Sequence, residues 1–281
     1  MIKFFQTLES RLNAAGSGNA KRAVEELAAH VLGCKPLEIY FKTITPEQQM
    51  ELERLIVRAE QGEPIQYIIG HVDFRGLEIC CDRRALIPRP ETEQLVEQVL
   101  QAVASGEWRV ASELKIADIG TGTGCISLAL LHELPNAVVT AIDISPDALA
   151  LARENAGRLG LLDRFQALEN NLLDGFEKHT LDIVVSNPPY IFSEVWKNLE
   201  PCVRDFEPKL ALDGGADGLD LIRTLVKQAS RVLKAGGGLF LEIGYDQGLA
   251  VSKLLEQHGF QQVETIKDLA GLDRIVLGLR P

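Results

Sequence analysis

From Lys115 onward, short apolar runs rich in β-branched residues alternate with segments of helical periodicity. Strands are predicted at residues 115–119, 137–142, 164–168, 181–186, 237–243, 261–267 and 274–279. Helices are predicted near residues 124–133, 146–159, 217–234 and 246–258. Such alternation requires a mostly parallel sheet covered by helices on both faces, because each strand must bury two apolar sides. The predicted fold class is therefore α/β, with seven strands in the sheet.

The N-terminal part of the chain has a different pattern, because its apolar residues recur at helical spacing. The repeat is clearest over residues 21–33, and Pro46 opens a second helix that runs to about residue 61. Residues 63–87 are rich in β-branched residues and glycine, which predicts a β-hairpin. We expect a helical domain over residues 1–62, a hairpin linker over 63–87 and the α/β domain over 88–281.

The charge balance argues against a protein that grips duplex nucleic acid. The net charge is −11; residues 1–75 carry 9 basic and 10 acidic side chains, and the rest of the chain carries 20 and 30. Proteins that bind DNA usually present a basic face, because neutralised phosphates supply most of the non-specific affinity. We therefore expect no direct nucleic-acid binding.

Other bulk features predict a cytoplasmic protein. The sequence contains no run of eighteen apolar residues, so no membrane span is expected. Polar residues follow the first five residues at once, so no signal peptide is expected. The five cysteines show no CxxC spacing, which disfavours a zinc site or a disulfide framework and is typical of a reducing compartment.

A glycine-rich segment follows the first predicted strand of the α/β domain and leads into a helix. Glycines let the backbone turn sharply and let a ligand approach it closely. A dinucleotide fingerprint would require glycine at position 125, where this chain has Cys125. The segment therefore suits a ligand without a pyrophosphate, such as S-adenosylmethionine. We call it the glycine loop; its residues are Gly120, Thr121, Gly122, Thr123 and Gly124.

Two aspartates accompany this loop. Asp143 ends the next predicted strand, 23 residues after Gly120, where a carboxylate can accept hydrogen bonds from both hydroxyls of a ribose. Asp143 could instead cap the helix that Ser145 and Pro146 open, but the preceding glycine loop favours ribose binding. Asp118, just before the loop, could bind the methionine amino group or could serve as a core or capping residue.

A second turn, Asn187-Pro188-Pro189-Tyr190, follows a strand predicted to be buried on both faces. Proline lacks an N–H, so this NPPY turn should be stiff and should lie where open α/β sheets bind ligands. The Asn187 side-chain oxygen and the Pro188 carbonyl are two acceptors that could hold both hydrogens of a planar –NH2 group. Tyr190 would offer a flat face beside that group. The turn is typical of methyltransferases that act on amide or amine nitrogen.

With these features placed, the chain resembles the bacterial release factor glutamine methyltransferase family (PrmC/HemK) over essentially its whole length. The most distinctive matching run is Leu86-Ile87-Pro88-Arg89-Pro90-Glu91-Thr92-Glu93. The other matching segments are residues 66–70, 74–76, 118–124, 187–191, 207–208, 214–219, 242–245 and 270–274. The resemblance implies that residues 88–93 line the active-site cleft.

The resemblance also implies a fold and an activity. The fold is a Rossmann-like, class I S-adenosylmethionine-dependent methyltransferase domain behind an N-terminal helical domain that docks the substrate. The activity is methylation of the glutamine side-chain amide nitrogen (N5) in the Gly-Gly-Gln motif of class 1 peptide chain release factors, in translation termination. S-adenosylmethionine would be the cofactor, S-adenosylhomocysteine the product, and no metal would be required.

By position, the resemblance assigns the glycine loop, Asp143, Asn171, Leu172 and Asn187 to the cofactor, and the NPPY turn to the glutamine. Family members often have an acidic residue followed by an aromatic one where this chain has Asn171 and Leu172. Asn171 could still hydrogen-bond the adenine amine, whereas Leu172 would give apolar packing alone.

Three other functions fit parts of the pattern. A DNA adenine-N6 methyltransferase would use the same turn on a flipped base, but the acidic charge and the lack of an evident target-recognition domain count against it. A methyltransferase acting on a ribosomal-protein glutamine would share the catalytic motifs, so it stays open. A non-catalytic or NAD-binding module is disfavoured by Cys125.

Overall fold

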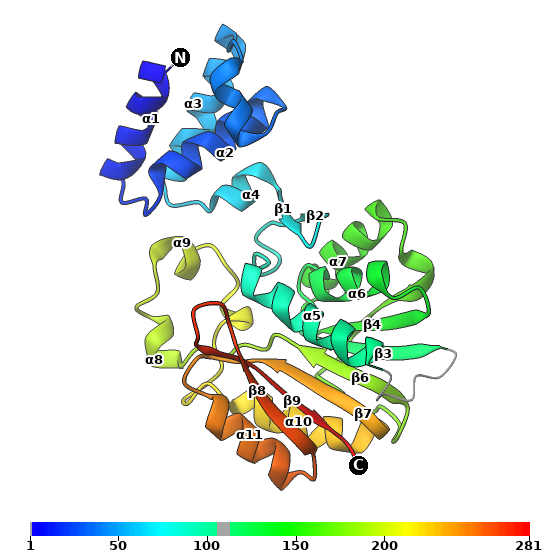
Figure 1. Ribbon diagram of the computed structural model, residues 1–281. Helices are drawn as coiled ribbons and strands as arrows, with labels where there is room; N and C mark the ends of the chain where they lie inside the picture. The colour runs from blue at the N-terminus through cyan, green and yellow to red at the C-terminus, as the bar shows by residue number, and fades with distance from the viewer. Residues whose placement is uncertain (1, 106–112) are drawn as a thin grey trace. The chain divides into compact units, whose positions relative to one another are not determined.

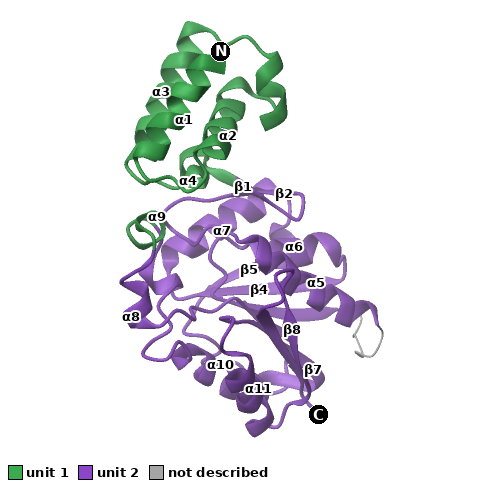
Figure 2. Ribbon diagram, turned by 60° about the vertical axis from the view of Figure 1, so that its left-hand side comes forward, with its two compact units in different colours: residues 1–71, 200–206 green, residues 72–199, 207–281 purple. Residues whose placement is uncertain are grey.

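A computed structural model of the protein describes residues 2–105 and 113–281. The chain forms two compact units, coloured separately in Figure 2. Unit 1 comprises residues 1–71 and 200–206, and unit 2 comprises residues 72–199 and 207–281. Within the described residues, no helix is both long and apolar enough to cross a membrane.

Unit 1 is helical, as the apolar spacing predicts. Its helices are α1 (Ile2–Ala14), α2 (Ala20–Leu32), the 3-10 helix η1 (Pro36–Phe41), α3 (Pro46–Glu60), α4 (Ile65–Ile69) and α9 (Pro201–Arg204). Helix α2 ends at Gly33, which adopts a left-handed conformation with φ 59°. A capping box opens α3, in which Thr45 accepts from the Gln48 N–H and the Gln48 side chain accepts from the Thr45 N–H.

The linker prediction is wrong for one segment. Residues 65–69 form helix α4, although their β-branched content predicts an extended strand. Ile68 is buried in the core of unit 1, and Gly70 ends the helix with φ 91°. Burial against the bundle therefore outweighs the weak local preference of these residues. The predicted hairpin is shorter than expected and consists of β1 (His71–Phe74) and β2 (Leu77–Cys80).

Unit 2 contains a seven-stranded sheet in the order β5-β4-β3-β6-β7-β9-β8. All neighbouring pairs are parallel except those that β9 makes with β7 and β8, which confirms the mostly parallel sheet. The strands are β3 (Leu114–Ile119), β4 (Ala137–Asp143), β5 (Phe165–Glu169), β6 (Leu181–Ser186), β7 (Leu233–Glu242), β8 (Gln261–Lys267) and β9 (Asp273–Leu279) (Figure 1).

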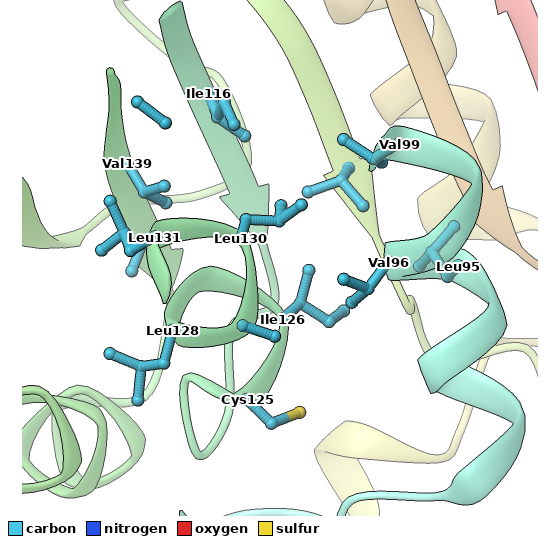
Figure 3. Close-up of a cluster of buried hydrophobic side chains, with 14 of the residues drawn as sticks. Leu95, Val96, Val99, Ile116, Cys125, Ile126, Leu128, Leu130, Leu131 and Val139 are labelled. Carbon is cyan, nitrogen blue, oxygen red and sulfur yellow. The ribbon is translucent and has the colours of Figure 1, made fainter. Parts of the chain in front are cut away.

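Helices cover both faces of this sheet. They are α5 (Pro90–Ala104), α6 (Cys125–Glu133), α7 (Pro146–Arg158), α8 (Ser193–Trp196), α10 (Asp220–Val232) and α11 (Gly248–Gln257), with 3-10 turns η2 (Leu162–Arg164) and η3 (Lys209–Ala211). Residues of α5, α6 and α7 form one buried cluster with β3 and β4, part of which Figure 3 shows. Residues of α10 and α11 form the other. Successive residues of β6 and β7 alternate between the two clusters, so both faces of these strands are buried.

Strand β7 begins four residues earlier than the sequence predicts. Leu233 pairs with Leu181, the register then shifts, and Gly238 pairs with Ile183. The irregularity includes Gly236, whose φ is 78°. The strand predicted at residues 237–243 starts within this glycine run, whereas the observed strand includes the whole run at an irregularity in its pairing with β6.

The register places three loops side by side. Ile119 at the end of β3 pairs with Ile142 of β4 on one side and with Ser186 of β6 on the other. The glycine loop, Asp143 and the NPPY turn therefore begin at the same edge of the sheet. The chain order reverses between β3 and β6, and such a switch point is where open α/β sheets bind ligands.

Candidate functional site

A cleft in unit 2 lies at this edge, and most of its lining is apolar. Of the residues predicted for the site, Gly120, Thr121, Gly122, Thr123, Asp143, Asn171, Leu172, Asn187, Pro188 and Pro189 line it. Gly124 and Tyr190 are not among its lining residues. An apolar cleft with a few converging polar groups is the usual form of a small-molecule site.

The glycine loop is tied to the neighbouring strand by its backbone. The N–H groups of Gly120 and Thr121 both donate to the carbonyl of Ile142, at 2.8 and 3.0 Å. Gly120, Gly122 and Gly124 have φ values of 68°, 55° and 82°, which favour glycine. A Cβ atom at Gly124 would lie 3.2 Å from the Cβ of Ala152, so this glycine permits close packing of α6 against α7.

Asp143 bridges the glycine loop and the start of α7. Its Oδ2 accepts from the Gly122 N–H and its Oδ1 from the Ser145 N–H, both at 3.0 Å. Ser145 itself caps α7, because its hydroxyl accepts from the Ala148 N–H. Burial raises the pKa of Asp143 despite these hydrogen bonds. Each carboxylate oxygen retains a lone pair, so Asp143 can still accept from hydroxyl groups in the cleft.

Asp118 is fully buried beneath the glycine loop. Its Oδ2 accepts from the Thr121 hydroxyl at 2.7 Å, and from the Ser127 hydroxyl and N–H at 2.6 and 3.2 Å. Its Oδ1 has no hydrogen-bond partner among the described residues. Burial raises the pKa of Asp118 to about 6. Asp118 therefore holds the loop in place, and because it does not line the cleft, its binding of a methionine amino group stays a prediction.

The NPPY turn presents its first three residues to the cleft. Among the described residues, no backbone N–H donates to the carbonyl of Pro188, which therefore remains an available acceptor. The Tyr190 hydroxyl donates instead to Glu242, at 3.4 Å, and burial raises the pKa of Tyr190. Stacking of Tyr190 on a substrate thus stays a prediction.

A second group of glycines supports the turn from behind. A Cβ atom at Gly214 would lie 2.6 Å from the Pro189 carbonyl, and one at Gly218 would overlap the Tyr190 carbonyl. The Gln247 amide donates to the carbonyls of Tyr190 and Gly218, at 3.1 and 3.3 Å. The matching run at residues 214–219 therefore has a packing role that the sequence alone does not reveal.

The loop after β5 contains the two residues predicted to contact adenine, and both line the cleft. Asn171 is exposed and donates to Asp174 at 3.1 Å, so its side-chain oxygen is turned away from that bond and is available as an acceptor. Leu172 is buried and has φ 52°. Asn170 also lines the cleft, although the sequence did not predict it, and its amide donates to the Leu172 and Asp174 carbonyls.

The run at residues 86–93 lines the cleft through five residues, as the resemblance implies: Leu86, Ile87, Pro88, Arg89 and Thr92. Glu207, which is buried, fixes this run by accepting from the Ile87 N–H at 3.1 Å and from the Arg89 guanidinium at 2.5 Å. Thr92 donates to the buried carboxylate of Glu242. Glu207 and Glu242 lie in two of the segments that match the family, but a single acidic residue carries no local pattern that links it to the site.

The donor set of the cleft fits S-adenosylmethionine better than a phosphate ligand. Beside the glycine loop stands a carboxylate, which would repel a phosphate but can accept from ribose hydroxyls. Ile142, Ile144 and Leu172 offer an apolar wall for an adenine ring. The described residues contain no cluster of three or more His, Cys, Asp or Glu that could hold a metal ion.

Comparisons with known proteins agree with this geometry. Residues 4–70 match the PrmC N-terminal domain and residues 94–198 match the methyltransferase small domain. A methyltransferase from Pyrococcus furiosus shares the fold, with a TM-score of 0.52, 18% identity and coverage of 73% of this chain and 89% of that one.

Two relatives carry the name release factor glutamine methyltransferase. The one from Agrobacterium fabrum is 40% identical, over 95% of this chain and 92% of its own length. The one from Caulobacter vibrioides is 40% identical, over 100% of this chain and 96% of its own length. The chain therefore belongs to the release factor glutamine methyltransferase family.

Proposed function

We propose that this protein transfers a methyl group from S-adenosylmethionine to the side-chain amide nitrogen of the glutamine in the Gly-Gly-Gln motif of class 1 peptide chain release factors. The observation that carries the proposal is the juxtaposition of the glycine loop, the Asp143 carboxylate and the NPPY turn at one edge of the sheet. The cytoplasm is the expected location, because release factors act on ribosomes there.

The residues of the cleft divide the task. The glycine loop, Asp143, Asn171 and Leu172 hold the cofactor, while Asn187 and Pro188 hold the glutamine. When bound, S-adenosylmethionine would supply an electrophilic methyl group and leave as S-adenosylhomocysteine, and the glutamine amide nitrogen would take the methyl group and lose one proton.

An amide nitrogen is a poor nucleophile because its lone pair is delocalised into the carbonyl. The Asn187 side-chain oxygen and the Pro188 carbonyl would accept from the two amide hydrogens. These two hydrogen bonds would orient the nitrogen for in-line attack and stabilise the positive charge that grows on it. Positioning of this kind can lower a barrier by about 7–11 kcal/mol in favourable cases.

Unit 1 would recognise the release factor, with residues 1–62 as the recognition domain, 63–87 as the linker and 88–281 as the catalytic domain. Large apolar side chains of unit 1 lie in solvent, among them Leu37, Phe41 and Met50, with exposed fractions of 77%, 91% and 73%. A bound protein partner would remove such apolar side chains from water. Deletion of residues 1–60 should abolish methylation of the intact factor while S-adenosylmethionine binding persists; unchanged methylation would refute this role.

The function is tested by incubating the protein with S-adenosylmethionine and a purified release factor and weighing the Gly-Gly-Gln peptide. One added methyl group on that glutamine is expected. Parallel incubations with ribosomal proteins and with DNA distinguish the two alternative substrates.

A further inference from the structure

A network of buried hydrogen bonds joins the NPPY turn to α5 and to the end of β7. Asn187 donates through Nδ2 to the Thr92 hydroxyl at 3.1 Å, and Thr92 donates to Oε2 of Glu242 at 2.7 Å. The Tyr190 hydroxyl donates to Oε1 of the same carboxylate at 3.4 Å. Thr92 and Glu242 have exposed fractions of 2% and 1%, so water cannot replace these partners. The four residues come from α5, the end of β7 and the loop after β6.

The number of hydrogens available in this network fixes the orientation of the Asn187 side-chain amide. An ionised carboxylate accepts only, so the single hydroxyl hydrogen of Thr92 must point at Glu242. The Thr92 oxygen can then only accept from its other neighbour, and Asn187 can donate only through its amide nitrogen. The Asn187 side-chain oxygen is thereby left as the group that faces the cleft, which Asn187 lines.

The opposite orientation would defeat the proposed chemistry. If Glu242 carried a proton and donated it to Thr92, the Thr92 hydroxyl could donate to the Asn187 oxygen. The amide group could then turn over and present its –NH2 group to the cleft. An –NH2 group cannot accept from the –NH2 group of a substrate glutamine, so the substrate would lose one of its two acceptors.

We propose that Thr92 and Glu242 are positioning residues that lock the Asn187 carboxamide with its oxygen toward the substrate amide. The proposal rests on the proposed function of the NPPY turn and adds the residues that decide which end of the Asn187 amide faces the substrate. Neither residue touches the reacting atoms; both act through Asn187.

The charges around Glu242 make this lock sensitive to pH. Burial raises the pKa of Glu242 to about 7. The hydrogen bonds from Thr92 and Tyr190 and the positive charge of Arg274 on β9 lower it. The negative charge of Glu91 on α5 raises the pKa of Glu242 further. The Glu242 carboxylate in turn raises the pKa of the Cys125 thiol on α6. The correct orientation of Asn187 therefore predominates above about pH 7.

The test compares two substitutions of one hydroxyl. Thr92→Val keeps the shape of the side chain but removes both hydrogen bonds, whereas Thr92→Ser keeps the hydroxyl. We expect Thr92→Val to lower kcat for release factor methylation by roughly 10- to 100-fold with little change in the KM for S-adenosylmethionine, because a misdirected group costs catalysis rather than cofactor binding. Thr92→Ser should restore most of the lost kcat. Equal kcat in Thr92→Val and wild type would overturn the proposal.

A second measurement needs no substrate and separates this proposal from the proposed function. In a 1H–15N spectrum, the side-chain amide of Asn187 should shift as Glu242 titrates, and this shift should vanish in Thr92→Val and persist in Thr92→Ser. Absence of the shift in the wild-type protein would overturn the lock. A wild-type protein that shows the shift but methylates no glutamine would instead overturn the proposed function.

Discussion

Replacement of Gly218 by alanine should damage catalysis through the backbone of the NPPY turn. Gly218 has φ 70°, and a Cβ atom there would overlap the carbonyl oxygen of Tyr190. The same atom would lie 2.8 Å from the Phe192 ring. Ordinary contact requires about 3.5 Å, so the turn or the loop must move by roughly 1 Å.

The two costs of this substitution can be estimated separately. The left-handed conformation costs alanine about 1–2 kcal/mol relative to glycine, and overpacking adds about 1–3 kcal/mol. The free energy of unfolding should therefore fall by about 2–5 kcal/mol. A displacement of about 1 Å at the two substrate acceptors should lower kcat by about 100-fold.

Gly236 provides a matched control, because it has φ 78° but a Cβ atom there would meet no other atom within 4 Å. Gly236→Ala should cost about 1–2 kcal/mol of stability and leave kcat unchanged. Urea unfolding and steady-state methylation assays measure the two quantities in both variants. Wild-type kcat in Gly218→Ala would refute the view that this glycine sets the position of the turn.

Three further predictions concern other parts of the site. Asp143→Ala should weaken S-adenosylmethionine binding, measured by calorimetry, because it removes the ribose acceptor and frees the Gly122 N–H; unchanged affinity would exclude the assigned role. The wild-type kcat should rise with pH through about 7, whereas Glu242→Gln, which has no ionisable group at this position, should lack this rise. Arg89→Ala should lower the free energy of unfolding by roughly 1–3 kcal/mol in urea, because the buried Glu207 loses its charged partner.

The central strands of unit 2 could be predicted because they are buried on both faces and are rich in apolar β-branched residues. Residues 181–186, for example, are all buried, which is typical of a central strand in a parallel sheet. The positions of the glycine loop and Asp143 could be predicted for a related reason. Each lies at the carboxyl end of a strand, and parallel strands place these ends at the same edge of the sheet.

The contacts that support the NPPY turn could not be predicted, because they join distant parts of the chain. Thr92 and Glu242 are 150 positions apart, and Thr92 and Asn187 are 95 apart. No local period or spacing encodes such pairs. Similarly, residues 200–206 belong to unit 1 although they lie inside the range expected for the catalytic domain. Helix α4 is helical because tertiary burial of Ile68 decides its conformation.

The central claim is that Asn187 holds the glutamine amide of a release factor for methylation. The most direct test incubates wild type, Asn187→Ala and a control variant with S-adenosylmethionine and release factor, and then measures the mass of the Gly-Gly-Gln peptide over time. The control is Asn136→Ala, an exposed residue just before β4, at the opposite edge of the sheet from the cleft.

We expect one methyl group on the glutamine for wild type and Asn136→Ala. For Asn187→Ala we expect a kcat about 10²- to 10³-fold lower, equivalent to about 3–4 kcal/mol of transition-state stabilisation. Methylation of the glutamine by Asn187→Ala at the wild-type rate would contradict the account.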